Sequence, residues 1–187
     1  MKLKQIEKIV KKKKTIILLE DVDCQWIGDG AAFYSIRDLP KMTQENIFSM
    51  FDVAEDQQSR YYFREEPMPI GVSFADIDEE EQPLERDIFR FEENGTMLEA
   101  LKSSTGAVFV QERYLKPFED MEYGYDLYER FRADGGTYIA VKKGMYLLGI
   151  ICPYKVDRVT FVERLKAFLE LTKMALYNEK CAEGEAM

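Results

Sequence analysis

The sequence predicts an α+β fold in which antiparallel sheets carry helices packed on one face, with a long helix near the C-terminus. Segments near both ends, residues 2–13 and 158–178, place apolar side chains at helical spacing. Between them, short β-branched and aromatic runs are separated by glycine- and proline-containing turns, which is typical of antiparallel strands. At 187 residues and 46% hydrophobic content, the chain is long enough to bury a core without a metal or a disulfide.

The first predicted helix covers residues 2–13. Leu3, Ile6, Ile9 and Val10 share one helical face, and lysines occupy the rest of the surface. This periodicity predicts a helix that buries its apolar face against a sheet and leaves its lysines in water.

Positive charge is concentrated in this first segment of an acidic chain. Residues 2–15 hold seven lysines and one glutamate, and removing their +6 from the net charge of −9 leaves −15 for the remainder. Such segregation predicts either a surface for an anionic partner such as duplex DNA or a face that keeps the segment hydrated. The candidate DNA-contact residues are Lys4, Lys8, Lys11 and Lys12.

Strands and a second helix follow. The β-rich run at residues 15–22 predicts a strand, and residues 25–36 predict a hairpin because a Gly-Asp-Gly turn separates two apolar and aromatic runs. Thr43 is a predicted N-cap for a short helix at residues 44–51, whose apolar side chains share a face.

The middle of the chain has a weaker pattern. Residues 54–87 are interpreted as strands joined by solvated loops, because aromatic pieces alternate with prolines. The acidic run at residues 78–81 could hold a divalent cation, but we interpret it as a solvated face. An Asn-Gly pair within residues 87–101 predicts a further hairpin.

The pattern becomes clearer from residue 107. Residues 107–111 predict a strand and residues 112–120 a short helical turn. Three more alternating runs, joined at glycines, predict a three-stranded antiparallel meander at residues 125–131, 137–144 and 145–154.

Asp157 is the predicted N-cap of the longest helix, at residues 158–178. Its apolar stripe consists of Val162, Leu165, Phe168, Leu169, Thr172 and Leu176. Helix and strands thus follow each other in a similar order near both ends, which predicts two α+β halves, residues 1–90 and 91–178, that share one compact unit. Residues 179–187 are expected to form a flexible tail.

The composition argues against an enzyme. The chain contains no histidine, which removes the commonest general base and histidine metal sites. Its three cysteines lack C-x-x-C spacing, and neither glycine-rich nucleotide fingerprint is present. We therefore expect no catalytic residues, no metal and no cofactor; an enzyme that works with carboxylates is the least favoured alternative.

The same composition favours a cytoplasmic protein with reduced thiols. The apolar run after the first lysines is too short for a signal-peptide core, and 18 apolar residues never occur in succession. Neither secretion nor a membrane span is expected.

Residues 108–156 resemble the closing part of the bacterial DNA sliding clamps. Tyr114 and Leu115 match the short helix of that family, and the segment Cys152-Pro153-Tyr154-Lys155-Val156 is similar to its C-terminal tail. The start of the chain, from Leu3 to Ile36, is similar to the helix, strand and hairpin that open a clamp domain. The region around "RYLKP" also looks like proteins of bacterial prophages and mobile elements.

The resemblance implies a clamp-like repeat of helix and β-meander, with helices that face DNA and contact phosphates without reading bases. It also implies an apolar pocket that captures peptides of protein partners, for which Pro153, Tyr154 and Val156 are the candidates by position. The implied function is a non-enzymatic clamp-like protein that acts through protein partners, with sequence-independent DNA contact and oligomer formation both possible. The alternative is a prophage or mobile-element interaction protein that does not bind DNA.

Overall fold

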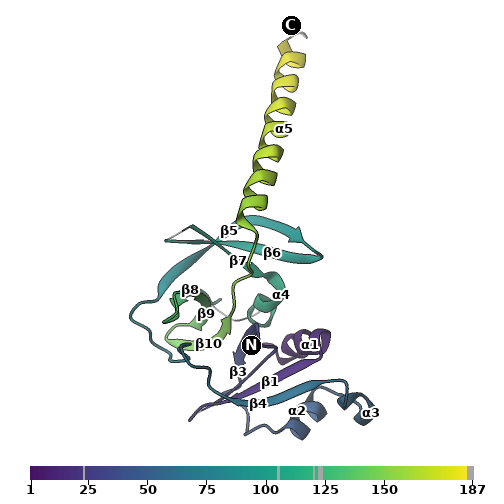
Figure 1. Cartoon of the computed structure of the whole chain (residues 1–187), viewed down its shortest axis with the longest axis vertical. Helices are drawn as coiled ribbons and strands as arrows, with labels where there is room; N and C mark the ends of the chain where they lie inside the picture. Colours follow the sequence, from purple (N-terminus) through teal and green to yellow (C-terminus); the bar gives the residue numbers. More distant parts are fainter. Residues whose placement is uncertain (23, 105, 120, 122–123, 185–187) are drawn as a thin grey trace. The chain divides into compact units, whose positions relative to one another are not determined.

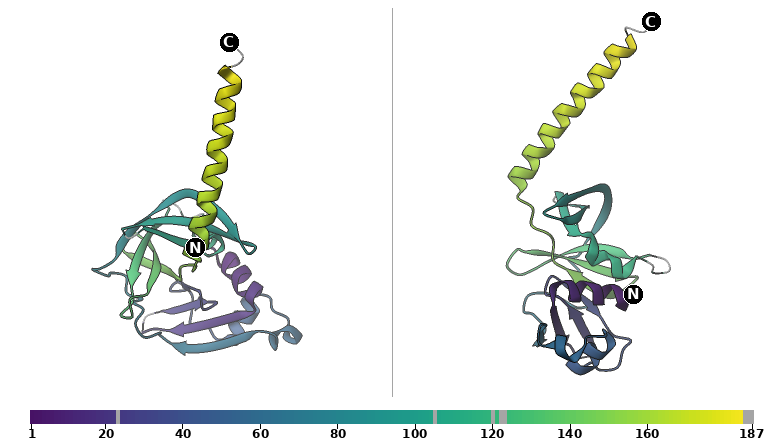
Figure 2. Two further views of the ribbon diagram at one scale, coloured as in Figure 1. Left: turned by 45° about the horizontal axis from the view of Figure 1, so that its top comes forward. Right: turned by 90° about the vertical axis from the view of Figure 1, so that its right-hand side faces the viewer.

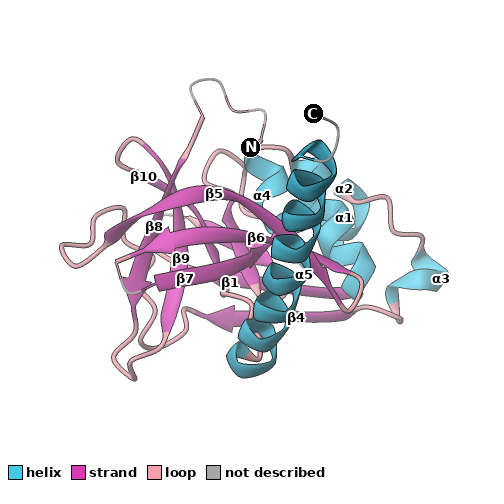
Figure 3. Cartoon of the chain, turned by 90° about the horizontal axis from the view of Figure 1, so that it is seen from above, coloured by secondary structure: helices cyan, strands magenta, loops and turns pink. Residues whose placement is uncertain are grey.

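The computed structural model describes the whole chain except residues 23, 105, 120, 122–123 and 185–187. It is an α+β fold with a large mixed sheet (Figures 1 and 3). The helices are α1 (Leu3–Lys13), α2 (Gln44–Met50), α3 (Glu55–Gln58), α4 (Glu112–Leu115) and α5 (Arg158–Gly184), with a 3-10 turn, η1 (Lys116–Phe118). The strands are β1 (Thr15–Glu20), β2 (Gln25–Gly28), β3 (Ala32–Ser35), β4 (Tyr62–Pro67), β5 (Gln82–Glu93), β6 (Thr96–Ser103), β7 (Gly106–Gln111), β8 (Asp126–Phe131), β9 (Thr137–Lys143) and β10 (Tyr146–Ile151).

Local sequence signals account for most of these elements. Helix α1 buries Ile6, Ile9 and Val10, and Lys14, the residue that caps its C-terminal end, has a left-handed backbone with φ of 50°. Thr43 caps α2 by accepting a hydrogen bond from the backbone N–H of Asn46 at 3.4 Å. The Asn-Gly pair between β5 and β6 has positive φ at both positions, as a tight hairpin turn requires.

The strands lie in the order β4-β1-β2-β3-β10-β9-β8-β5-β6-β7. The predicted meander is confirmed, because β8 pairs antiparallel with β9 and β9 with β10. Strand β5 pairs with β8 through its first residues and with β6 through the remainder. The expectation of purely antiparallel sheets is wrong at β4, which pairs parallel to β1. A parallel partner needs a crossover connection, and here the crossover contains α2 and α3.

A helix followed by three antiparallel strands occurs twice between residues 3 and 151. Helix α1 precedes β1, β2 and β3, while α4 and η1 precede β8, β9 and β10. The last strands of the two sets, β3 and β10, are antiparallel neighbours near the middle of the sheet. Helix α1 also contacts η1, and the backbone N–H of Lys2 donates to the carbonyl of Pro117 at 2.8 Å.

Two clusters of buried apolar side chains cover the sheet. The larger includes buried apolar residues of α1, α2, α4 and η1, so these helices share one core, and α1 packs next to β1 (Figure 2). The smaller contains Leu19, Trp26, Phe74, Tyr138, Ala140, Leu147 and Ile150. Along β1 the side chains alternate between the two clusters, with Ile16 and Leu18 in the larger and Leu19 in the smaller.

The chain divides into two units, residues 1–154 and 155–187. The boundary that the sequence predicted at residue 90 falls within β5, in the middle of the first unit. The predicted long helix is present as α5 and is capped by Asp157, whose side chain accepts from the backbone N–H of Val159 at 3.2 Å. This helix extends to Gly184 and so includes residues that we had assigned to a flexible tail.

Candidate functional site

Helix α1 presents the candidate DNA-contact lysines. Lys4, Lys8 and Lys12 are all exposed and are spaced by four residues, so they form one ridge along the helix, with a rise of about 6 Å between neighbours. Within the described part of the chain, none of these three lysines forms an ion pair with another side chain. The ridge therefore presents three positive charges to solvent.

Lys11 lies differently from the other candidates. Its Nζ donates to Oε1 of Glu7 at 2.7 Å, one turn earlier on the same helix. That hydrogen bond raises the pKa of Lys11. Because a carboxylate already neutralises it, Lys11 adds less to the positive field than the three lysines of the ridge.

The end of α1 is fixed by a buried carboxylate. The Asp29 side chain is fully buried and forms an ion pair with Lys13 at 3.0 Å. It also accepts from the hydroxyl of Tyr114 at 2.8 Å and from the backbone N–H groups of Ala31 and Ala32 at 3.0 and 3.1 Å. Burial lowers the pKa of Lys13, but its hydrogen bonds to Tyr114 and Asp29 outweigh that effect and raise it. We name Asp29, Lys13 and Tyr114 the Asp29 cluster; sequence reasoning did not identify it.

Tyr34 gives a pH test of the structure around this cluster. Its hydroxyl donates to the carbonyl of Tyr114 at 3.1 Å, and burial raises the pKa of Tyr34 well above its ordinary value. In the unfolded chain the phenol ionises near pH 10, approximately its ordinary pKa. Above that pH the unfolded state loses a proton that the folded state keeps, so this contribution to stability is complete below about pH 10 and is lost as the pH rises.

We therefore expect Tyr34→Phe to make the alkaline loss of stability less steep. At neutral pH the variant loses one buried hydrogen bond, which costs about 1 kcal/mol. Urea denaturation at neutral and alkaline pH measures both effects, with Tyr146→Phe as the control because Tyr146 is 61% exposed. Equal alkaline slopes for the wild-type and Tyr34→Phe proteins would contradict the assigned role of Tyr34.

The acidic run at residues 78–81 is only partly the solvated face that the sequence predicted. Glu81 accepts from Arg130 at 2.6 and 2.9 Å and pairs with Lys142 at 2.5 Å. Arg130 is fully buried, and Asp78 lies 3.9 Å from its guanidinium. Two acids of the run therefore compensate buried cations of β8 and β9 and have a structural role.

Backbone carbonyls attach the preceding segment to the same arginine. Arg130 donates to the carbonyls of Ser73 and Ala75 at 3.3 and 2.8 Å, and to that of Asp76 at 3.4 Å. The side chain of Asp76 in turn accepts from both guanidinium N–H groups of Arg37 at 3.2 Å. We name residues 73–81 the covering segment, since its Phe74 packs in the smaller apolar cluster.

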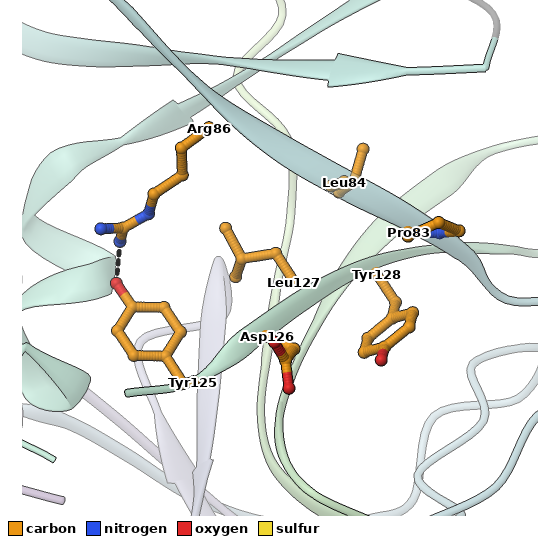
Figure 4. Close-up of a pocket in the computed structure, with 7 residues that line it drawn as sticks. All are labelled: Pro83, Leu84, Arg86, Tyr125, Asp126, Leu127 and Tyr128. Atoms are coloured by element: carbon orange, nitrogen blue, oxygen red, sulfur yellow. Dashed lines mark hydrogen bonds between the residues drawn. The ribbon is translucent and has the colours of Figure 1, made fainter. Parts of the chain in front are cut away.

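A small hollow lies where β5 leaves β8 (Figure 4). Arg86 and Tyr125 line one side and hydrogen-bond to each other, and the guanidinium lies 4.8 Å from the centre of the tyrosine ring. Arg86 also pairs with the buried carboxylate of Glu99 at 3.1 Å. The hollow therefore holds a cation that is already neutralised, and its lining does not favour an anionic ligand. The lining residues are Pro83, Leu84, Arg86, Tyr125, Asp126, Leu127 and Tyr128.

The candidate peptide-pocket residues follow β10. Pro153, Tyr154 and Val156 are half-buried, and the backbone N–H of Tyr154 donates to the carbonyl of Phe109 at 2.7 Å. Tyr154 is the last residue of the first unit, whereas Val156 belongs to the second. The three side chains thus do not lie within one unit, and the hollow at Arg86 includes none of them.

The cysteines and acidic side chains of the described residues were the remaining candidates for a metal site. Among the described residues, no three histidine, cysteine, aspartate or glutamate side chains gather as a cation site. Cys24 and Cys152 are free thiols. Glu129 on β8 is 2% exposed, and its Oε2 accepts no hydrogen bond from any residue that the structure describes. A buried polar atom without a hydrogen-bond partner lowers stability.

The last helix exposes a large apolar surface. From Val162 to Asn178 every side chain of α5 is exposed, and several are large and apolar. The most exposed of these are Phe168 and Tyr177 at 69%, Leu171 at 64% and Met174 at 63%, and Val159 in the first turn is also 69% exposed. None of the helices within the described residues is both long and apolar enough for a membrane span.

Comparison with protein-family models, with curated proteins and with solved structures finds no match to this chain.

Proposed function

We propose that this chain is a non-enzymatic, clamp-like protein that acts through protein partners and that contacts the phosphate backbone of duplex DNA through α1. The observation that carries the DNA contact is the ridge of Lys4, Lys8 and Lys12, three exposed lysines at four-residue spacing without acidic partners among the described residues. Phosphate contacts of this kind position a protein on DNA but do not read its sequence.

The arrangement of the first unit supports the clamp-like part of the proposal. A helix and a three-stranded meander occur twice, the final strands of the two sets pair, and α1 contacts η1. A sliding clamp likewise combines a helical layer with antiparallel strands, as the resemblance in sequence implied. The ridge belongs to one of these helices, and so the DNA-facing role falls to α1.

The alternative is an interaction protein of a prophage or mobile element that does not bind DNA. Two observations favour it. The net charge of −9 repels a polyanion such as DNA from the parts of the protein surface outside the ridge. The exposed apolar side chains of α5 also provide a binding surface that requires no nucleic acid.

Replacing the ridge tests the DNA contact. We expect weak, sequence-independent binding of the wild-type protein to a short duplex at low salt, and a steep loss as salt increases. Lys4→Gln, Lys8→Gln and Lys12→Gln combined should weaken binding and reduce the salt slope by up to about 3, since each phosphate contact contributes about 0.9. Fluorescence anisotropy of a labelled duplex measures both quantities.

The control removes the same charge from elsewhere in the first unit. Lys41→Gln, Arg60→Gln and Lys102→Gln alter three exposed cations that lie outside α1. This triple variant should retain the wild-type salt slope more closely than the ridge variant. The acidic run at 78–81 is unsuitable for a control, because Glu81 compensates Arg130 and Lys142. Absence of wild-type binding at low salt would refute the DNA contact and leave the alternative function.

A further inference from the structure

Five side chains along α5, four of them apolar, follow one another with spacings of three, four, three and four residues. They are Val162, Leu165, Leu169, Thr172 and Leu176. This spacing keeps the side chains on one line along the helix, as in the first and fourth positions of a coiled-coil heptad. The four apolar side chains are between 38% exposed, at Leu165, and 52% exposed, at Leu169 and Leu176, and Thr172 is exposed as well. We name these five residues the α5 seam.

We propose that the α5 seam binds the same seam of a second copy of this chain, as a parallel two-stranded coiled coil. A seam of this spacing is complementary to itself, because knobs at heptad positions fit the holes between equivalent positions of an identical helix. The inference depends on α5 alone and is independent of DNA binding by α1.

The side chains that flank the seam determine the orientation. Lys166 and Lys173 lie on one flank, and Phe168, which is 69% exposed, lies on the other. In a parallel pair, opposite flanks of the two helices meet, so that Lys173 of one copy approaches Phe168 of the other and its aliphatic stem covers the ring. In an antiparallel pair like flanks meet, which would bring lysines of both copies together. Charge repulsion therefore favours the parallel pair.

The net charge of α5 also permits pairing between copies. The helix contains five cations and four acids, and Lys173 pairs with Glu170 at 2.8 Å within one helix. A nearly neutral helix can approach its copy without the repulsion expected from a chain of net charge −9.

The apolar residues Leu171 and Met174 lie on α5 but away from the seam, so substitutions there serve as a matched control for substitutions in the seam.

Sedimentation equilibrium of the full chain over a range of concentrations tests the association. We expect a mass of twice 21.9 kDa at high concentration. Leu165→Asp with Leu169→Asp should raise the dissociation constant at least about 100-fold, because each copy would place two charges in an apolar seam. Leu171→Asp with Met174→Asp, which adds the same charge off the seam, should change it less than about tenfold.

A wild-type protein that remains monomeric at the highest concentration would overturn the proposal, and α5 would then bind its own first unit or another protein. Equal losses in the two double variants would also overturn it, since the seam would then have no special role. Circular dichroism of each variant shows whether the helix content is retained.

Disulfide trapping tests the orientation in a background with Cys24→Ser, Cys152→Ser and Cys181→Ser. A parallel, in-register pair places position 162 of one copy beside position 162 of the other. Val162→Cys should therefore form a disulfide dimer under mild oxidation. If it forms none, but a mixture of Val162→Cys and Leu176→Cys copies does, the pair is antiparallel and the proposed orientation is wrong.

Discussion

Replacing Arg130 by methionine is expected to lower the free energy of unfolding by about 3–5 kcal/mol, the range seen when one partner of a buried ion pair is removed. Arg130 is fully buried and donates two hydrogen bonds to Glu81, at 2.6 and 2.9 Å. The variant would leave Glu81 with Lys142 as its cationic partner, and the carbonyls of the covering segment would lose their donor. Methionine fills a similar volume, so that the loss reports mainly on charge and hydrogen bonds.

Arg132 provides the matched control, because it follows β8 by one residue and pairs with Asp134 at the surface. Their side chains are 44% and 60% exposed, and such a pair contributes about 0–1 kcal/mol. Urea denaturation, followed by the fluorescence of Trp26, the single tryptophan, measures the free energy of unfolding of Arg130→Met and of the control variant Arg132→Met. Trp26 also contacts Phe74 of the covering segment, with ring centres 4.9 Å apart. A loss below about 1 kcal/mol in Arg130→Met would show that the buried pair is not essential.

Arg130 also shows why the structural role of two residues of the acidic run, Asp78 and Glu81, could not be predicted from the sequence. Four consecutive acids are usually solvated, and nothing near them in the chain indicates otherwise. The partners of Glu81, Arg130 and Lys142, lie 49 and 61 residues away from it in the chain and become neighbours only when the sheet forms. Both cations lie in segments whose alternating apolar residues predict buried strands. A cation within such a strand was the one sign in the sequence that an acidic partner is buried beside it.

The elements that depend on local patterns were predicted well. Helix α1 was expected at residues 2–13 and spans Leu3–Lys13, because the spacing of Ile6, Ile9 and Val10 is a property of that segment alone. The hairpins and the final meander were fixed by glycines at their turns. The same holds for α5, whose N-cap and periodicity lie within one continuous segment.

Local sequence patterns could not predict which strands from distant parts of the chain pair with each other. The parallel pairing of β1 with β4 and the antiparallel pairing of β3 with β10 join strands that are far apart in the chain. A period-two pattern states which face of a strand is buried but not which strand lies beside it. For the candidate site, the lysines of the ridge were predicted from the sequence, but their charge pattern could not show that Lys11 pairs with Glu7 while Lys4, Lys8 and Lys12 remain exposed.

Asp29→Ala is expected to destabilise the first unit by about 3–5 kcal/mol, because a fully buried carboxylate there satisfies several donors at once. Its removal leaves the buried hydroxyl of Tyr114 and the N–H groups of Ala31 and Ala32 without their acceptor. It also separates the end of α1 from the turn between β2 and β3, since Lys13 loses its partner.

Asp29→Asn separates these contributions. The amide oxygen still accepts from the turn N–H groups, but the charge that pairs with Lys13 is absent. Lys13 is 36% exposed and can regain water, so we expect a loss of about 1–2 kcal/mol, well below that of the alanine variant. Lys13→Met, introduced into the wild-type protein and into both Asp29 variants, completes the double-mutant cycles, whose free energies of unfolding are measured by urea denaturation. A coupling near zero between Asp29 and Lys13, together with equal losses for the alanine and asparagine variants, would mean that neither the ion pair nor the turn hydrogen bonds stabilise this end of α1.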